Sequence, residues 1–125
     1  MKATDLMIGD WVSVDSQIGQ VMFYSQINAL VQIAENHGIE CEAKDIKPIP
    51  LTEGILINNG FPRVEDPLYD IPIFETPFSK GGFYFEHWKS GFGLTDHCYI
   101  RIQYVHEFQH LLKLCGIDKE IILET

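Results

Sequence analysis

The sequence predicts an α+β fold in one domain, residues 1–125. Short runs in the first part alternate apolar and polar residues, as half-buried strands do. Two prolines, Pro48 and Pro50, then favour an extended joint. One strongly amphipathic helix stands near the C-terminal end. We therefore expect an N-terminal β lobe over residues 1–47 and a C-terminal α+β lobe over residues 48–125.

The N-terminal lobe is expected to consist of short strands joined by tight turns. Gly19 and the Asn-His-Gly sequence at 36–38 separate the apolar runs. This spacing predicts a curled antiparallel sheet or a small SH3-like barrel. The predicted strands are Trp11–Val14, Gln20–Tyr24, Asn28–Ala34 and Ile39–Ala43.

The C-terminal lobe is expected to open with a short helix, Glu53–Asn58. Thr52 stands at its N-cap position, and Asn59-Gly60 is a typical end, because glycine readily adopts a left-handed conformation. A β-meander with turns at 79–82 and 90–93 follows. Its predicted strands are Leu68–Glu75, Phe83–Trp88 and Cys98–Gln103, and 117–123 is predicted to be a last short strand or an extended tail.

The predicted final helix, 104–116, has both an apolar face and a chemical motif. At about 100° per residue, one side gathers the apolar residues and the other gathers His106 and His110. We expect the histidines to face outward. The side chains expected to be buried are Val105, Phe108, Leu111 and Leu112.

The sequence His106-Glu107-x-x-His110 matches the signature of zinc metalloproteases. One hypothesis is therefore a minimal zinc hydrolase, with His106 and His110 as zinc ligands and Glu107 as the catalytic general base. Catalytic zinc needs a third protein ligand, and glycine stands at position 116, where the extended motif has histidine. Downstream, the remaining candidates are Asp118, Glu120 and Glu124. We therefore favour an ordinary amphipathic helix, with no catalytic residue, metal or cofactor.

The cysteines do not predict a disulfide or a zinc site. Cys41, Cys98 and Cys115 are odd in number and lack a C-x-x-C spacing, so we expect free, buried thiols. His97 and Cys98 are neighbours on a predicted strand and would point to opposite faces. The aromatics Phe83, Phe85, Trp88 and Phe92 are expected in the core.

The charge balance limits the classes of partner. The chain has 18 acidic and 9 basic residues, a net charge of −9. An acidic surface repels phosphate backbones, so direct nucleic-acid binding is disfavoured. An acidic inhibitor that mimics nucleic acid remains an alternative. No apolar run is long enough to span a membrane, and no secretory signal is recognisable, so we expect a cytoplasmic protein.

Three segments together resemble a known group of proteins: Leu6–Val12, Ile49–Phe61 and Ile102–Leu111. The chain resembles small uncharacterised proteins from gut Bacteroidales, often found in prophage or mobile-element settings. The resemblance implies no activity, cofactor or catalytic residue. The helix of that group reads Tyr-Val-His-x-Leu-Gln-x-Leu, which implies that neither Glu107 nor His110 is required.

From these observations we expect a non-enzymatic protein-interaction or accessory module, of phage origin, that acts through a protein partner or a homo-oligomer. The aromatic content and the incomplete catalytic site favour this interpretation. The zinc hydrolase and the acidic inhibitor are the alternatives.

Overall fold

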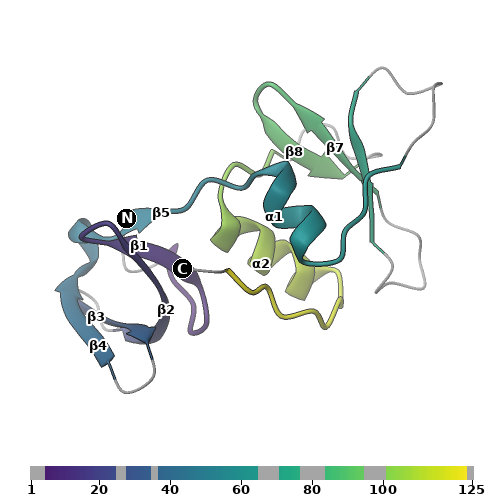
Figure 1. The fold of residues 1–125 in the computed structure, drawn as a ribbon. Coiled ribbons are helices and arrows are strands. Elements are labelled where there is room, and N and C mark those ends of the chain that lie inside the picture. Colours follow the sequence, from purple (N-terminus) through teal and green to yellow (C-terminus); the bar gives the residue numbers. More distant parts are fainter. Residues whose placement is uncertain are drawn as a thin grey trace. The chain divides into compact units, whose positions relative to one another are not determined.

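The computed structural model describes residues 5–24, 28–34, 37–64, 71–76, 84–94 and 101–123. Two antiparallel sheets and two α-helices confirm the predicted α+β class (Figure 1). The chain divides into two compact units. The first unit comprises residues 1–50, 104–106 and 123–125, and the second comprises 51–103 and 107–122. In the described part, no helix is both long enough and apolar enough to cross a membrane.

The first unit is built on a five-stranded antiparallel sheet in the order β4-β3-β2-β1-β5. The curled sheet of the prediction is confirmed, and among the described residues no strand pairing closes it into a barrel. A 3₁₀ turn, η2 (Ala43–Asp45), precedes β5. The strands are β1 (Trp11–Val14), β2 (Gln17–Tyr24), β3 (Asn28–Ala34), β4 (His37–Glu42) and β5 (Lys47–Pro48).

Local backbone chemistry explains how this sheet turns. Asp15 and Ser16 form a two-residue hairpin loop, and both have positive φ (50° and 66°), as the tight turns that suit twisted strands require. A Cβ at Gly19 would collide with the backbone oxygen of Gln32, so glycine lets β2 approach β3 closely. The side chains enclosed by the sheet are aliphatic: Leu6, Val12, Val14, Val21, Ala29, Val31 and Ile46.

The second unit begins with α1 (Glu53–Asn58), which has the predicted bounds. The Thr52 hydroxyl accepts a hydrogen bond from the Ile55 N–H (3.2 Å), and Gly60 has the predicted left-handed φ of 87°. Asn59, which ends the helix, is buried. Its Nδ2 donates to the oxygens of Ile55 (2.9 Å) and Ile122 (3.0 Å), and its Oδ1 accepts from the Ile122 N–H (2.7 Å).

A three-stranded antiparallel sheet, in the order β6-β7-β8, follows in the second unit. It contains β6 (Ile73–Glu75), β7 (Tyr84–Trp88) and β8 (Gly91–Leu94). Residues 65–70, 77–83 and 95–100, which include the predicted turn at 79–82 and parts of all three predicted strands, lie outside the described residues.

The predicted turn at 90–93 is wrong, because the turn occupies Lys89-Ser90 and the glycines that follow belong to β8. Phe92 and Ile102 exchange backbone hydrogen bonds of 2.7 and 2.6 Å. A Cβ at Gly91 would press against the Ile102 oxygen, so Gly91 permits this close pairing. Gly91 therefore both closes the hairpin opposite Trp88, with a positive φ of 131°, and permits the close pairing with Ile102.

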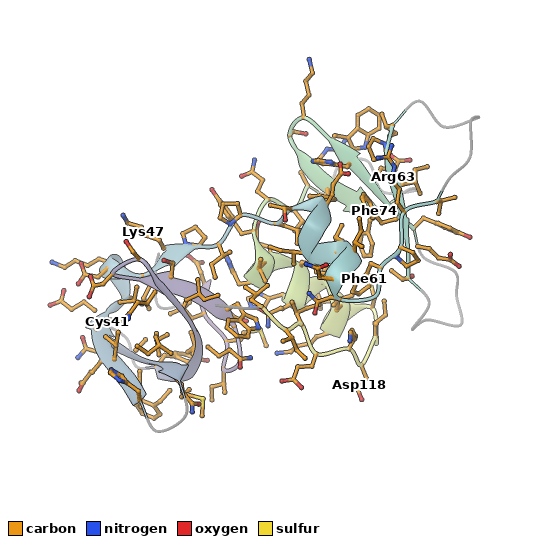
Figure 2. All side chains as sticks on the ribbon, in the orientation of Figure 1. Cys41, Lys47, Phe61, Arg63, Phe74 and Asp118 are labelled. Atoms are coloured by element: carbon orange, nitrogen blue, oxygen red, sulfur yellow. The ribbon has the colours of Figure 1, made fainter. Side chains whose placement is uncertain are left out.

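Five phenylalanine rings lie in the core of the second unit, together with buried aliphatic residues such as Leu56 and Leu112. The rings meet edge to face: Phe108 lies 5.2 Å from Phe61 and 5.1 Å from Phe85 between centroids. The packing continues where Phe74 meets Phe92 at 6.1 Å. All five rings are fully buried, and Figure 2 labels Phe61 and Phe74 among the side chains of this unit.

The final helix, α2, spans Val105–Leu114. It ends at Gly116 (φ 71°), where the Ile117 N–H bonds the Leu112 oxygen (2.8 Å) and the Gly116 N–H bonds the Lys113 oxygen (3.1 Å), a Schellman motif. Val105, Phe108 and Leu112 are buried as predicted, whereas Leu111 is only half-buried. The extended-tail alternative is confirmed for 117–123, which has no regular secondary structure but buries Ile117 and Ile121.

Candidate functional site

The first histidine of the predicted zinc motif does not face outward. His106 is only 8% exposed, and its ring stacks on Tyr104 with centroids 6.0 Å apart. The reason lies in the first turn of α2. Tyr104 pairs with Pro50, and the Val105 N–H donates to the Ile49 oxygen (2.8 Å), so an extended segment packs beside this turn. His110, one turn later, is half-buried.

Glu107, the general base of the zinc hypothesis, has a structural role at the start of α2. Its Oε1 accepts a hydrogen bond from the Gln103 N–H (3.0 Å) just before α2. Carboxylates in the first turn stabilise a helix by satisfying such backbone donors and by facing the positive end of the helix dipole. In the described segments, no three His, Cys, Asp or Glu side chains are grouped to hold a metal ion. A fit to zinc would therefore depend on a third ligand from elsewhere.

Of the other reactive side chains that the structure describes, His87 is held by structural contacts, whereas two cysteines are free thiols. His87 Nδ1 pairs with Glu53, and its ring stacks on Phe92 at 4.1 Å, which joins β7 to α1. Cys41 and Cys115 are free thiols but only half-buried, not buried as predicted. Burial raises the pKa of both thiols, and the carboxylates of Asp45, Asp15 and Glu40 raise that of Cys41 further. His97 and Cys98 lie outside the described residues.

The aromatic side chains of the meander are divided between core and surface. Phe85 and Phe92 are buried as predicted, and Phe83 lies outside the described residues. Trp88 is partly exposed, against the prediction. Its Nε1 donates to Glu86 (2.9 Å), and the Arg101 guanidinium lies 5.3 Å from its ring centroid. Trp88 is exposed because it alternates with Phe85 and His87 along β7.

A more distinctive surface lies on β2, where the pairing register shifts between Val21 and Phe23. Val21 faces the core opposite Val31, whereas Phe23 stands opposite Leu30, so Met22 is an extra residue in a β-bulge. Regular alternation would return Phe23 to the core side. The bulge instead turns it outward, and its side chain is 64% exposed.

The next strand pair extends this arrangement. Leu30 on β3 pairs with Phe23 on one side and with Glu40 on β4 on the other. We name this row Phe23–Leu30–Glu40 the outer ladder. All three residues are exposed. A Cβ at Gly38 would stand only 3.0 Å from the Leu30 Cδ1, so this glycine leaves room for the leucine beside β4.

A surface groove of about 260 Å³ follows the outer ladder. Its exposed lining combines the apolar Phe23 and Leu30 with the polar Asn28 on β3 and the carboxylate of Glu40 on β4. The volume suits one or two side chains rather than a whole cofactor. Among the residues that the structure describes, those that line it are Phe23, Asn28, Ala29, Leu30 and Glu40.

Sequence reasoning placed strands at 20–24, 28–34 and 39–43 but did not single out the ladder residues. One signal was present: Val21-Met22-Phe23-Tyr24 is a run of four apolar residues, which a strand with one buried face cannot bury by simple alternation. Such a run indicates either a doubly covered strand or a bulge.

Comparison with known proteins adds no assignment. No protein-family model, no curated protein and no solved structure matches the chain.

Proposed function

We propose that this chain is a non-enzymatic interaction module that binds a protein partner through the outer ladder and its groove. The observation that carries the proposal is the exposure of Phe23 by the bulge at Met22. β-Bulges are typical devices for re-aiming a side chain next to a functional site. Here the re-aimed side chain borders a groove.

The energetics support a binding role. Burial of a phenylalanine side chain is worth about 1.5–3 kcal/mol, a gain that Phe23 does not realise in the folded chain. Leu30, the partner of Phe23 on β3, extends the apolar surface and is also exposed. Clusters of this kind, with a polar rim, mark contact sites for other proteins. A partner that covered Phe23 and Leu30 would gain the unrealised burial energy.

The broader biological role is also a proposal. The resemblance to Bacteroidales mobile-element proteins favours an accessory module of phage origin that works in the cytoplasm. The interaction surface is compatible with this role, because accessory proteins act by binding. The net charge of −9 favours a protein partner over a nucleic acid.

A peptide-display selection tests the proposed function directly. Random dodecapeptides are selected on the wild-type chain, and each enriched peptide is then measured on Phe23→Ser. We expect at least roughly tenfold weaker binding to this variant, because an exposed aromatic anchor carries much of such an interface.

The matched control is Leu114→Ser, which removes an apolar side chain that is 85% exposed on α2. We expect its binding to equal that of the wild type. If no peptide is enriched, or if the enriched peptides bind Phe23→Ser as well as the wild type, the outer ladder is not the interaction site and the proposal fails.

A further inference from the structure

We infer that the partner segment is basic as well as apolar: an extended stretch that places an apolar side chain against Phe23 and Leu30 and a lysine or arginine against Glu40. This inference rests on the proposed function and names the chemistry of the partner. It follows from the charges on and around the outer ladder and from the spacing of its strands.

Glu40 is the first reason. It lines the groove, is exposed, and forms no ion pair with any residue that the structure describes. Glu42, two residues along β4, alternates onto the same side and pairs with Lys44 at 3.4 Å. Within the described part of the chain, the groove therefore presents one carboxylate without an ion-pair partner, beside the apolar Phe23 and Leu30.

The surroundings of Glu40 are acidic as well. Residues 1–50, the N-terminal stretch of the first unit, contain seven acidic residues and three lysines. The raised pKa of the Cys41 thiol agrees with this field, because after burial its causes are the carboxylates of Asp45, Asp15 and Glu40. Negative charge thus gathers around β4 and would attract a cation during encounter.

The same charges argue against the other occupants. A second copy of the chain would bring another −9 and a second Glu40 to the same surface. An acidic segment would place like charges together in a partly desolvated groove. A neutral apolar segment would cover Phe23 and Leu30 but would leave Glu40 partly desolvated without a partner. A cation beside the apolar side chain satisfies both parts of the groove.

The strand spacing sets the pattern of the segment. Neighbouring strands lie about 4.8 Å apart, so the ladder runs roughly 10 Å from β2 to β4. In an extended peptide, side chains on one face repeat every roughly 6.8 Å. An apolar residue at one position and a lysine or arginine two positions later would therefore span from Phe23 and Leu30 to Glu40.

The probe is a blocked octapeptide with this pattern, Ser-Leu-Ser-Lys-Ser-Leu-Ser-Lys, titrated into ¹⁵N-labelled protein and followed by backbone NMR shifts. We expect shifts on β2, β3 and β4. Replacing its lysines with glutamates, or its leucines with serines, should weaken binding at least roughly tenfold. About 0.5 M NaCl should weaken the lysine peptide severalfold, because salt screens the charges.

Variants of the protein test whether Glu40 is the group that contacts the lysines of the peptide. Glu40→Lys should weaken the lysine peptide at least roughly tenfold, and Glu40→Gln severalfold. Glu120→Lys is the matched control, since Glu120 is exposed and its substitution changes the net charge equally. We expect less than about a twofold effect from it, because Glu120 belongs to the second unit and does not line the groove.

The outcomes separate the inference from the proposed function. If selected dodecapeptides depend on Phe23 but the glutamate octapeptide binds as well as the lysine one, or Glu40→Lys and Glu120→Lys act alike, the basic partner is wrong and the interaction site stands. If sedimentation instead shows a dimer of the wild-type chain that Phe23→Ser abolishes, the groove binds a second copy of the chain, and the inference of a basic partner is wrong. If no selected peptide depends on Phe23, both fall.

Discussion

In the second unit, Phe61, Phe74, Phe85, Phe92 and Phe108 are all fully buried, whereas Phe23, in the first unit, is 64% exposed. The first unit fills its interior with aliphatic side chains instead. Both Phe23 and Phe85 lie on β-strands. The difference between them comes from pairing: β7 alternates regularly against β6 and β8, and β2 carries a bulge against β3.

The comparison shows that residue type alone does not decide whether a side chain stabilises a fold or serves a surface. The aromatic rings of the second unit bury a large area for each residue. The first unit encloses valines and other aliphatic residues, whose side chains are smaller, and the bulge directs Phe23 away from them. We interpret Phe23 as part of the binding surface.

The largest expected effect is the difference in stability loss between two truncations, Phe108→Ala and Phe23→Ala. Phe108→Ala should destabilise the second unit by about 3–5 kcal/mol, because it leaves a cavity between Phe61 and Phe85. Phe23→Ala should change the stability of the first unit by less than about 0.5 kcal/mol. Urea unfolding measures both: Trp88 fluorescence in a Trp11→Phe background reports the second unit, and Trp11 in a Trp88→Phe background reports the first. Equal losses of unfolding free energy for the two variants would show that Phe23 is packed in a core as Phe108 is, which would contradict the difference between the units.

A smaller loss is expected from Asn59→Ala. The substitution removes the three side-chain hydrogen bonds to Ile55 and Ile122, and the partly buried backbone N–H and oxygen of Ile122 lose these partners. We expect a cost of about 1–3 kcal/mol in the same Trp88 experiment. Asn59→Asp is the matched control: its carboxylate can still accept from the Ile122 N–H but cannot donate. No loss of stability with Asn59→Ala would mean that these three hydrogen bonds do not contribute measurably to the stability of the second unit.

The smallest expected effect is on the reactivity of the two free thiols, Cys41 and Cys115. Raised pKa values keep Cys41 and Cys115 protonated at neutral pH, so both should react slowly with iodoacetamide and faster as the pH rises. Stability from these neutral thiols is present below the pKa of an unfolded cysteine and is lost as the pH rises through the higher folded value.

Asp45→Asn should accelerate alkylation of Cys41 roughly twofold at pH 8, because Asp45 is the first of the charges that raise its pKa. Cys115 serves as the internal control, since burial alone raises its pKa. Mass spectrometry of digested protein reads each cysteine separately. An unchanged rate at Cys41 would argue against the acidic field around β4.

Much of the fold follows from local sequence patterns. Alternation located the first four strands, and Thr52 with Gly60 gave the bounds of α1, because capping and strand alternation depend on residues close in sequence. The turn predicted at 90–93 failed because the role of Gly91 is set by Ile102, a residue distant in sequence. A glycine that permits close pairing looks, in sequence, like a glycine that permits a turn.

The candidate site was harder to predict, for the same physical reason. The bulge is a property of how β2 pairs with β3, and the β2 sequence alone indicates only an excess of apolar residues. For His106, the helical wheel describes one face of α2 correctly. Burial of the first turn, however, depends on the segment at Ile49–Pro50, more than fifty positions earlier.

The bonds between Asn59 and Ile122 also bear on the order of events during synthesis. The β1–β2, β2–β3 and β3–β4 pairings join neighbouring segments and close short loops, which favours rapid formation. The Asn59–Ile122 bonds span 63 positions and form only after the ribosome has added Ile122. We therefore expect the nascent chain to assemble most of its first sheet while Leu56 and Phe61 still lack Phe108, which would make an unfinished second unit the preferred substrate for chaperones.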